Sequence, residues 1–317
     1  MNNHLILSNY WNHHYPFTKG FKKIAVLIAG SINIKNMINS FLMIGQSNMA
    51  GRGYLNDVKQ LYDEKIKMLV NGRWQTMTEP INFDRPTSGI GLAASFAGAW
   101  RLKNDPEEIG LIPCADGGTS LDDWAVGGVL FENAVFQAKL ALRTSKLTGI
   151  LWHQGENDSF GGLSALYYDK LSVIVDAFRQ ELDAADVPFI TGGLGDFLIA
   201  GRYGKYFTEY QQVNDALLKF AETKPNCYFV TADGLSANQD GLHFDAKSQR
   251  RFGIRYFKSF DEKKNILTAV STEDELIESI QNRPLTKKEQ ATLLEIDFAS
   301  GKISLADLEE KLSLLND

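Results

Sequence analysis

The chain has 317 residues, enough to bury the core of one large domain or of two smaller ones. Its formal net charge is −6 and its isoelectric point is near 5.5, so no basic stripe is available to neutralise phosphates and no nucleic-acid partner is expected. Hydrophobic residues make up 44% of the chain, but no run of them reaches the length that crosses a bilayer, so no membrane partner is expected.

The first 36 residues are expected to lie apart from the rest of the chain. Residues 21–30 (FKKIAVLIAG) place two lysines before a short apolar run, as a signal peptide does. The basic part begins too late, and Trp11 and His14 precede it, so we predict no signal peptide and expect a cytoplasmic protein. Nothing near His13 and His14 offers a third ligand at a useful spacing, so no metal site is predicted there. We predict that residues 1–36 are a loosely attached extension.

From residue 40 to about residue 260, short apolar runs alternate with longer amphipathic segments. The apolar runs predict strands at 40–44, 66–70, 108–112, 148–152, 187–192 and 226–230. The amphipathic segments predict helices near 91–103, 132–146, 164–184, 205–222 and 245–259. This alternation predicts an α/β fold, with a mostly parallel sheet that helices cover on both faces.

The segments that follow the predicted strands are rich in glycine and in polar side chains. They read GQSNMAGRG (45–53), PCADGGTSLDDW (113–124), HQGENDS (153–159), GGLGDF (192–197) and TADGLSANQDGLHFD (231–245). In an open α/β sheet, ligands bind beyond the carboxyl ends of the strands. Every candidate catalytic residue of the chain therefore falls at the edge of the sheet where an active site is expected.

Ser47 follows the first predicted strand, where the chain must turn. A serine at this point either caps a helix in an ordinary connection or acts as a nucleophile. The segment QDGLHFD carries Asp240 and His243 three positions apart, so the carboxylate can hold one imidazole nitrogen while the other deprotonates a serine. A histidine in such a segment, taken alone, is more often a helix cap or a core residue. With Ser47 at the same sheet edge, we predict a triad of Ser47, His243 and Asp240.

The chain order Ser…Asp…His, with acid and base close together near the end of the domain, resembles that of the SGNH hydrolases. The segments GQSNMAGRG, GGTSLDDW, WHQGEND and DGLHF look like the motifs of the sialate O-acetylesterase-like group, which includes carbohydrate esterase family six and its acetylxylan esterases. The resemblance covers about residues 38–260. It does not reach the first 36 residues or the end of the chain.

This resemblance implies a three-layer α/β/α, flavodoxin-like fold and a serine esterase that removes acetyl groups from sugars without a metal or another cofactor. It implies Ser47 as nucleophile, His243 as base and Asp240 as orienting acid. It also implies an oxyanion hole formed by the backbone N–H groups of Ser47 and Gly118 and by the side-chain amide of Gln154. Gly118 equally suits a tight turn, and a glycine there serves both purposes because it lets the backbone approach a substrate.

Glu156 leaves the identity of the acid open. Its carboxylate either orders Gln154 and Ser47 from behind or serves as an alternative partner for His243. We favour Asp240, because its spacing to His243 on one turn fixes the geometry of the pair.

Five further residues are candidates for the walls of the site. Arg52, Asn157 and Asp158 are predicted to line it, although solvated loop side chains would give the same pattern. Trp124 and Phe160 are predicted to lie near its mouth, where an aromatic ring either stacks on a sugar or simply packs.

After residue 260 the character of the chain changes. Residues 262–317 contain 7 Lys and Arg against 12 Asp and Glu, so nearly all of the net negative charge lies there. Three helix-start patterns occur in succession, namely Thr272 with Glu275, Thr286 with Glu289, and Ser304 with Asp307. We predict three parts: an extension (1–36), an esterase domain (37–261) and an acidic helical appendage (262–317).

Two other functions compete with the acetylesterase. A thioesterase or lysophospholipase of the same fold should show a long apolar channel, which the polar, glycine-rich loops do not suggest. A carbohydrate-binding protein with an inactive site is opposed by the complete set of Ser47, His243 and Asp240. The predicted partner is an acetylated sugar, from sialate or from xylo-oligosaccharides, and the sequence leaves a homo-oligomer open.

Overall fold

The computed structural model describes residues 37–316, so the predicted extension, with its apolar stretch and its two histidines, lies outside the described residues. Seven strands form one sheet in the order β3-β2-β4-β1-β5-β6-β7. All neighbours are parallel except β2 and β3. The strands are β1 (Ile38–Gly45), β2 (Ile66–Val70), β3 (Arg73–Thr76), β4 (Ile109–Pro113), β5 (Ser145–His153), β6 (Phe189–Gly192) and β7 (Cys227–Val230).

Strand β1 lies at the centre of the sheet. All eight of its residues, INSFLMIG, are buried, as a strand with neighbours on both edges and helices on both faces requires. Leu42 pairs with Ile112 of β4 on one side and with Ile150 of β5 on the other. The segments after β1, β4 and β5 therefore leave the sheet next to one another.

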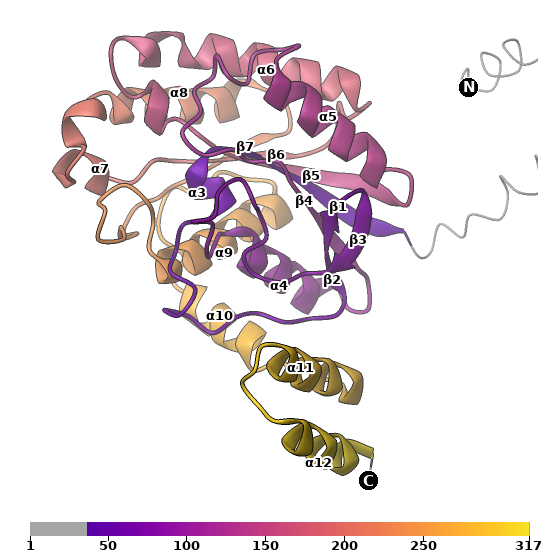
Figure 1. The fold of residues 1–317 in the computed structure, drawn as a ribbon. Coiled ribbons are helices and arrows are strands. Elements are labelled where there is room, and N and C mark those ends of the chain that lie inside the picture. Colours follow the sequence, from indigo (N-terminus) through magenta and orange to yellow (C-terminus); the bar gives the residue numbers. More distant parts are fainter. Residues whose placement is uncertain (1–36, 317) are drawn as a thin grey trace, which may run out of the picture. The chain divides into compact units, whose positions relative to one another are not determined.

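Helices cover the sheet on both faces (Figure 1). Helices α5, α6 and α8 lie on one face, and α4, α9 and α10 lie on the other, with the short helices α3 and α7 near the carboxyl ends of the strands. The helices are α3 (Ser47–Ala50), α4 (Ala93–Asn104), α5 (Val129–Ala141), α6 (Tyr167–Glu181), α7 (Phe197–Ala200), α8 (Tyr210–Thr223), α9 (Ala246–Glu262), α10 (Glu273–Gln281), α11 (Lys287–Ala299) and α12 (Leu305–Asn316). The predicted α/β architecture, with a mostly parallel sheet between two layers of helices, is confirmed.

Each face of the sheet carries its own hydrophobic core. Trp152 of β5 belongs to the core beneath α5, α6 and α8, together with Phe178 and Phe220 of those helices. Phe41 of β1 belongs to the core beneath α4 and α9, where its ring meets that of Phe96 edge to face at 4.9 Å. Successive residues of the buried strands thus supply both cores, which fixes the register of the sheet.

Strand β3 was not predicted. It forms a hairpin with β2 through Asn71 and Gly72, which both have positive φ angles, as a two-residue hairpin turn requires. Its residues, RWQT, alternate between exposed and half-buried positions at the edge of the sheet. A four-residue edge strand has no apolar run, and the Asn-Gly pair was its only signal.

Several predicted boundaries were displaced. The helix predicted at 132–146 spans 129–141, because Ser145 already begins β5 and pairs with β1. Short 3₁₀ turns at Leu163–Leu166 and Gly204–Tyr206 precede α6 and α8, where continuous helices were expected.

The helix starts predicted after residue 262 have mixed outcomes. Thr286 and Glu289 form the reciprocal capping box, and Ser304 and Asp307 bond each other's backbone in the same way. The prediction of a capping box at Thr272 is wrong, because the side chain of Thr272 makes no capping hydrogen bond at the start of α10.

Helix α10 contacts the helices of the esterase region. It packs on α9 and α4, and Ile280 lies against the core that those helices share. Glu273 at its start forms a buried ion pair with Arg255 of α9 at 2.6 Å. Helices α11 and α12 contact each other. The division of the chain at residue 261 stays a prediction. Among residues 37–316, no helix has the length and apolar character needed to cross a membrane.

Candidate active site

The polar segments after β1, β4 and β5 meet at the carboxyl edge of the sheet, together with the loop between β7 and α9. Ser47 begins α3 directly after β1, and Gly118 lies in the loop after β4. Asn157 lies in a 3₁₀ turn after β5. His243 lies in the loop between β7 and α9. Four segments that are far apart in the sequence thus contribute to one site.

Gly45 allows the chain to turn into Ser47. Its φ angle is +128°, and a Cβ atom built on it would lie 2.1 Å from the carbonyl oxygen of His153 in β5. Only glycine fits such a contact and such an angle. The next N–H, that of Gln46, donates to the same carbonyl at 2.8 Å. Strands β1 and β5 therefore end in contact, and this holds the start of α3 at the sheet edge.

Ser47, His243 and Asp240 form a chain of hydrogen bonds. His243 Nε2 lies 2.9 Å from Ser47 Oγ, and His243 Nδ1 lies 2.7 Å from Asp240 Oδ2. Asp240 Oδ1 accepts the backbone N–H groups of Leu242 and His243 at 2.8 and 3.0 Å, so the turn itself orients the carboxylate. In this arrangement the imidazole can accept the serine proton while the carboxylate holds the opposite ring nitrogen.

The environment of Asp240 keeps its carboxyl group ionised. Partial burial acts to raise its pKa, but the hydrogen bonds from the backbone and ring of His243 and from the backbone of Leu242 outweigh burial and lower the pKa below its ordinary value. The group is therefore a carboxylate at neutral pH, as a hydrogen-bond acceptor for an imidazole N–H must be.

The carboxylate of Glu156 bonds Asn48 and makes no hydrogen bond to His243. Its Oε1 accepts from Asn48 Nδ2 at 2.5 Å and lies 3.4 Å from His153 Nε2. Burial acts to raise the pKa of Glu156, but His153 and Asn48 outweigh it and lower the pKa. Of the two candidate acids, only Asp240 is within hydrogen-bond distance of the imidazole.

Asn48 connects the helix of the serine to the loop of the histidine. Its Oδ1 accepts the backbone N–H of Phe244 at 3.0 Å, while its amide donates to Glu156. Gln249 of α9 donates to the backbone carbonyl of Asn48 at 3.0 Å. These buried bonds fix the residues that directly follow Ser47 and His243. Asn48 was not predicted, because its position after the serine is its only signal in the sequence.

A cavity of about 260 Å³ opens at Ser47. Its wall includes Gly117, where a Cβ atom would lie 3.4 Å from Ser47 Cβ and 2.6 Å from the guanidinium of Arg52, so only glycine leaves this space free. The residues that line the cavity are Gln46, Ser47, Arg52, Arg85, Gly117, Gly118, Glu156, Asn157, Phe207, Leu242 and His243.

Arg52 lies in the wall of this cavity, and its charge is paired. A contact of Arg52 with a substrate stays a prediction. The guanidinium of Arg52 lies 2.5 Å from Asp84, whose Oδ2 also accepts the N–H of Gly117 at 2.8 Å. Burial acts to raise the pKa of Asp84, but the bonds from Arg52 and Gly117 lower it. Asp84, which anchors both Arg52 and the glycine loop, was not predicted from the sequence.

Gln154 does not occupy the position predicted for it. Its side chain is fully buried, and its amide nitrogen donates to the carbonyl of Thr119 at 3.0 Å and to Asp158 at 2.5 Å. Its oxygen accepts from the hydroxyl of Tyr167 at 3.0 Å. Both amide protons are therefore used inside the protein, so the prediction that this amide faces an oxyanion is wrong.

Asn157, three residues later, lies at the cavity instead. Its side-chain amide donates to the carbonyl of Gly118 at 2.6 Å and retains a second N–H. Within residues 37–316, the backbone N–H groups of Ser47 and Gly118 donate to no protein acceptor. Three N–H donors from three different segments are thus available around one cavity.

Two other predicted wall residues lie in the interior. Asp158 is buried, accepts from Leu121 N–H and Gln154, and lines neither cavity at the sheet edge. Trp124 is fully buried, meets Trp152 edge to face at 5.6 Å and donates to Thr119 Oγ1. Both side chains support the loop after β4 from within, so neither can contact a substrate as predicted.

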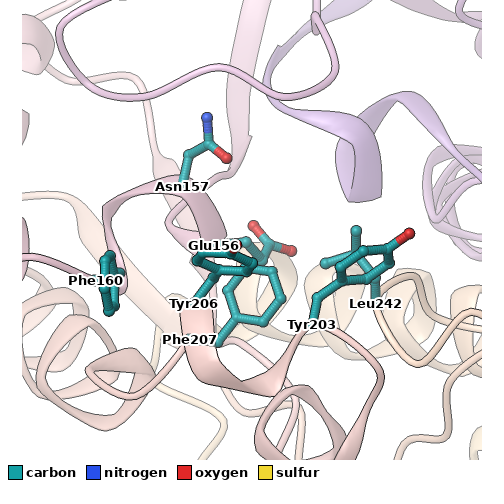
Figure 2. A pocket seen from close by; sticks show the side chains of 7 residues that line it. All are labelled: Glu156, Asn157, Phe160, Tyr203, Tyr206, Phe207 and Leu242. Atoms are coloured by element: carbon teal, nitrogen blue, oxygen red, sulfur yellow. The ribbon is translucent and has the colours of Figure 1, made fainter.

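Phe160 is exposed, as a residue near the mouth should be, and lines a second cavity of about 400 Å³ (Figure 2). The other aromatic residues of this cavity, Tyr203, Tyr206 and Phe207, were not predicted from the sequence. They come from the segment RYGKYF (202–207), whose three aromatic residues within positions 203–207 were the available signal. The lining residues are Glu156, Asn157, Phe160, Tyr203, Tyr206, Phe207 and Leu242.

In the part of the chain that the structure describes, no group of three or more His, Cys, Asp or Glu side chains is placed to hold a metal ion.

The sequence matches one family over most of its length. The profile of the family described as "Carbohydrate esterase, sialic acid-specific acetylesterase" matches residues 37–262. The chain is also 27% identical over 242 residues to a probable carbohydrate esterase of Arabidopsis thaliana, in a match that covers 69% of this chain and 89% of that protein.

Solved structures show the same fold. A protein of Arabidopsis thaliana is similar with a TM-score of 0.64 at 25% identity, covering 71% of this chain and 98% of that chain. NanS is similar with a TM-score of 0.59 at 17% identity, covering 72% and 98%. A carbohydrate acetylesterase from Xanthomonas citri is similar with a TM-score of 0.54 at 18% identity, covering 69% and 55%.

Proposed function

The chain belongs to the carbohydrate esterase family of sialic acid-specific acetylesterases, and from this membership we propose that it removes O-acetyl groups from sugars through an acetyl-serine intermediate. The observation that carries the proposal is the hydrogen-bonded chain from Ser47 Oγ through His243 to Asp240, with distances of 2.9 and 2.7 Å. A hydroxyl needs such a base to attack an ester at neutral pH.

In the first half of the reaction, Ser47 Oγ attacks the acetyl carbonyl carbon while His243 Nε2 takes its proton. The carbonyl oxygen becomes an oxyanion, and the bond to the sugar oxygen breaks as His243 returns the proton to that oxygen. The sugar leaves as an alcohol, and the acetyl group stays on Ser47. Asp240 holds the imidazole in the required tautomer and stabilises its charged form.

In the second half, a water molecule replaces the sugar. His243 takes a proton from the water, the resulting hydroxide oxygen attacks the acetyl carbon, and the bond to Ser47 Oγ breaks. The proton passes from His243 to Ser47 Oγ, and acetic acid leaves and loses its own proton to the solvent. Water is the only co-reactant that these steps require.

We assign stabilisation of the oxyanion to three donors. They are the backbone N–H groups of Ser47 and Gly118 and the side-chain amide of Asn157, which replaces the Gln154 amide of the sequence-based prediction. The support is that these groups border the cavity at Ser47, while the amide protons of Gln154 are used in the interior. Donors directed at the developing charge contribute about 3–4 kcal/mol each to lowering the barrier.

Acetylated sialate and acetylated xylo-oligosaccharides are the two substrates we propose. The test is the release of acetate from both by the wild-type protein and by Ser47→Ala. We expect the variant to fold normally and to lose activity by a factor on the order of 10³ or more, because the attacking atom is absent. Wild-type turnover by a freshly purified Ser47→Ala protein would overturn the proposal.

A further inference from the structure

The second cavity contains a cluster of aromatic side chains that the ester chemistry does not use. Phe160, Tyr203 and Tyr206 are 48%, 40% and 47% exposed, although each has a large apolar ring. Phe160 comes from the segment after β5, the two tyrosines come from the segment before α8, and Leu242 comes from the loop of His243 (Figure 2). Apolar side chains that gather on a surface from separate segments usually mark a binding site.

Each of these three rings contacts another side chain. Phe160 and Tyr206 meet edge to face, with their centroids 5.8 Å apart. Arg202 lies over the ring of Tyr203 at 5.6 Å, and Lys205 lies over the ring of Tyr206 at 4.8 Å. The contact of Phe160 with Tyr206 places two rings from separate segments side by side in the wall of the cavity.

The aromatic cavity continues into the cavity at Ser47. Four residues, Glu156, Asn157, Phe207 and Leu242, line both. An acetyl group at Ser47 therefore leaves the rest of the substrate free to extend past Asn157 toward the tyrosines. The two volumes, about 260 and about 400 Å³, provide more room together than an acetylated monosaccharide needs.

The chemistry of the aromatic cavity suits a sugar better than a hydrocarbon chain. A pyranose ring has a face of C–H groups, which packs on an aromatic ring, and a rim of hydroxyl groups, which needs donors and acceptors. The cavity offers both, since the hydroxyl groups of Tyr203 and Tyr206 and the side-chain amide of Asn157 lie in its wall together with the rings. The buried carboxylate of Glu156 also forms part of its wall, and hydrocarbon packed against a charge is unfavourable.

Resting on the proposed function, we infer that the aromatic cavity is a second sugar subsite, which binds the residue next to the acetylated one. The substrate class is then an O-acetylated oligosaccharide or glycoconjugate, and free acetylated monosaccharides are poorer substrates. Tyr203 and Tyr206 supply the stacking surfaces of this subsite.

The test compares matched substrates. One series is an acetylated xylose alone and as the terminal residue of a trisaccharide, and the other is an acetylated sialic acid alone and joined to lactose. Ethyl acetate, which has no ring to stack, is the reference ester. For the wild type we expect kcat/KM to favour the oligosaccharide about tenfold or more in the series that it accepts, equivalent to about 1.4 kcal/mol.

The variants are Tyr206→Ala and Tyr203→Ala, with Tyr206→Phe as the conservative replacement. We expect each alanine variant to reduce the ratio of oligosaccharide to ethyl acetate kcat/KM about five- to tenfold, mainly through KM, and Tyr206→Phe to retain most of it. A ratio does not depend on the folded fraction of a preparation. Phe136→Ala is the control, since Phe136 of α5 is 58% exposed and lines neither cavity.

The outcomes separate this inference from the proposed function. Hydrolysis of acetylated sugars with equal kcat/KM for the monosaccharide and the oligosaccharide would overturn the second subsite alone. An unchanged ratio in both alanine variants would do the same. Hydrolysis of ethyl acetate with no activity on any sugar acetate would overturn the proposed function and, with it, this inference.

Discussion

The carboxyl edge of the sheet and the C-terminal helices are held in place in different ways. At the sheet edge, buried polar side chains from separate segments bond one another, as Asn48 does with Glu156 and with the backbone of Phe244. In α11 and α12 most side chains reach solvent, and of residues 287–315 only Glu289 and Leu308 are buried. We therefore expect substitutions of the residues at the Ser47 cavity to change rates, whereas substitutions of the buried carboxylates at the starts of α10 and α11 should change stability.

The largest effect is expected at the acid of the triad. Asp240→Asn should lower kcat by a factor on the order of 10⁴, because an amide favours the wrong tautomer of His243. Glu156→Gln, the matched replacement of the second candidate acid, should cost less, because Glu156 bonds Asn48 and not the imidazole. Steady-state kinetics of the two variants on one aryl acetate measures the difference. If Glu156→Gln is the more damaging change, Glu156 is the acid and the assignment of Asp240 is wrong.

The next effect concerns stability and not rate. Glu273→Ala should leave the buried guanidinium of Arg255 without its partner, at a cost of about 3–5 kcal/mol in the free energy of unfolding. The neighbouring pair of Arg251 and Asp274 is solvent-exposed, so the control Asp274→Ala should cost less than about 1 kcal/mol. Denaturant unfolding measures both. Equal losses of unfolding free energy in the two variants would contradict the distinction between the buried and the exposed ion pair. A fall in kcat per folded molecule with Glu273→Ala would show that α10 also affects the active site.

The side-chain amides of Asn157 and Gln154, which both follow β5, should have different roles, one in the rate and the other in stability. Asn157→Ala should lower kcat about 10²–10³-fold with little change in KM, because an oxyanion donor acts only in the transition state. Gln154→Ala should instead cost about 1–3 kcal/mol of stability, because it leaves Asp158 and Tyr167 with fewer buried partners. Kinetics and unfolding of both variants form the measurement. A rate loss with Gln154→Ala and none with Asn157→Ala would restore the original assignment.

The smallest effect is a pH dependence of stability around α11. Burial acts to raise the pKa of Glu289, but Arg283 and the backbone N–H groups of Glu64 and Thr286 lower it to about 2. Since the folded pKa lies below the unfolded value, the stabilisation is fully present above about pH 4.5 and is lost as the pH falls toward 2.

Glu289→Gln should remove this part of the pH dependence, which we expect to be on the order of 1–2 kcal/mol because Arg283 is partly solvated. Free energies of unfolding between pH 2 and pH 7 measure it for both proteins. The same slope in the variant and the wild type would show that Glu289 is not its source.

The sequence predicted the features that depend on short stretches of chain. The apolar runs located six of the seven strands, and their order placed Ser47 and His243 at one sheet edge. The spacing of Asp240 and His243 on one turn predicted their hydrogen bond, since three residues fix that geometry. The capping box of Thr286 is equally local, and it is present.

Other features depend on tertiary contacts, which sequence patterns do not reveal. Gln154 and Asn157 are three residues apart, and the 3₁₀ turn after Gly155 decides which amide reaches the cavity. Gly155 needs a φ angle of +145°, which sequence patterns do not reveal. Likewise Trp124 was predicted near the mouth because its loop follows a strand, but its ring packs on Trp152. Tertiary packing decided these positions.

The central claim, an acetyl-enzyme on Ser47, can be tested directly. The wild-type protein is mixed with p-nitrophenyl acetate, quenched in acid within milliseconds to seconds, digested, and analysed by peptide mass spectrometry. We predict that the mass of one acetyl group appears on Ser47 during turnover and is absent from Ser47→Ala, while Asp240→Asn acquires it far more slowly. Turnover without acetylation of Ser47 at any quench time, or acetylation of another residue with the kinetics of turnover, would contradict the mechanism.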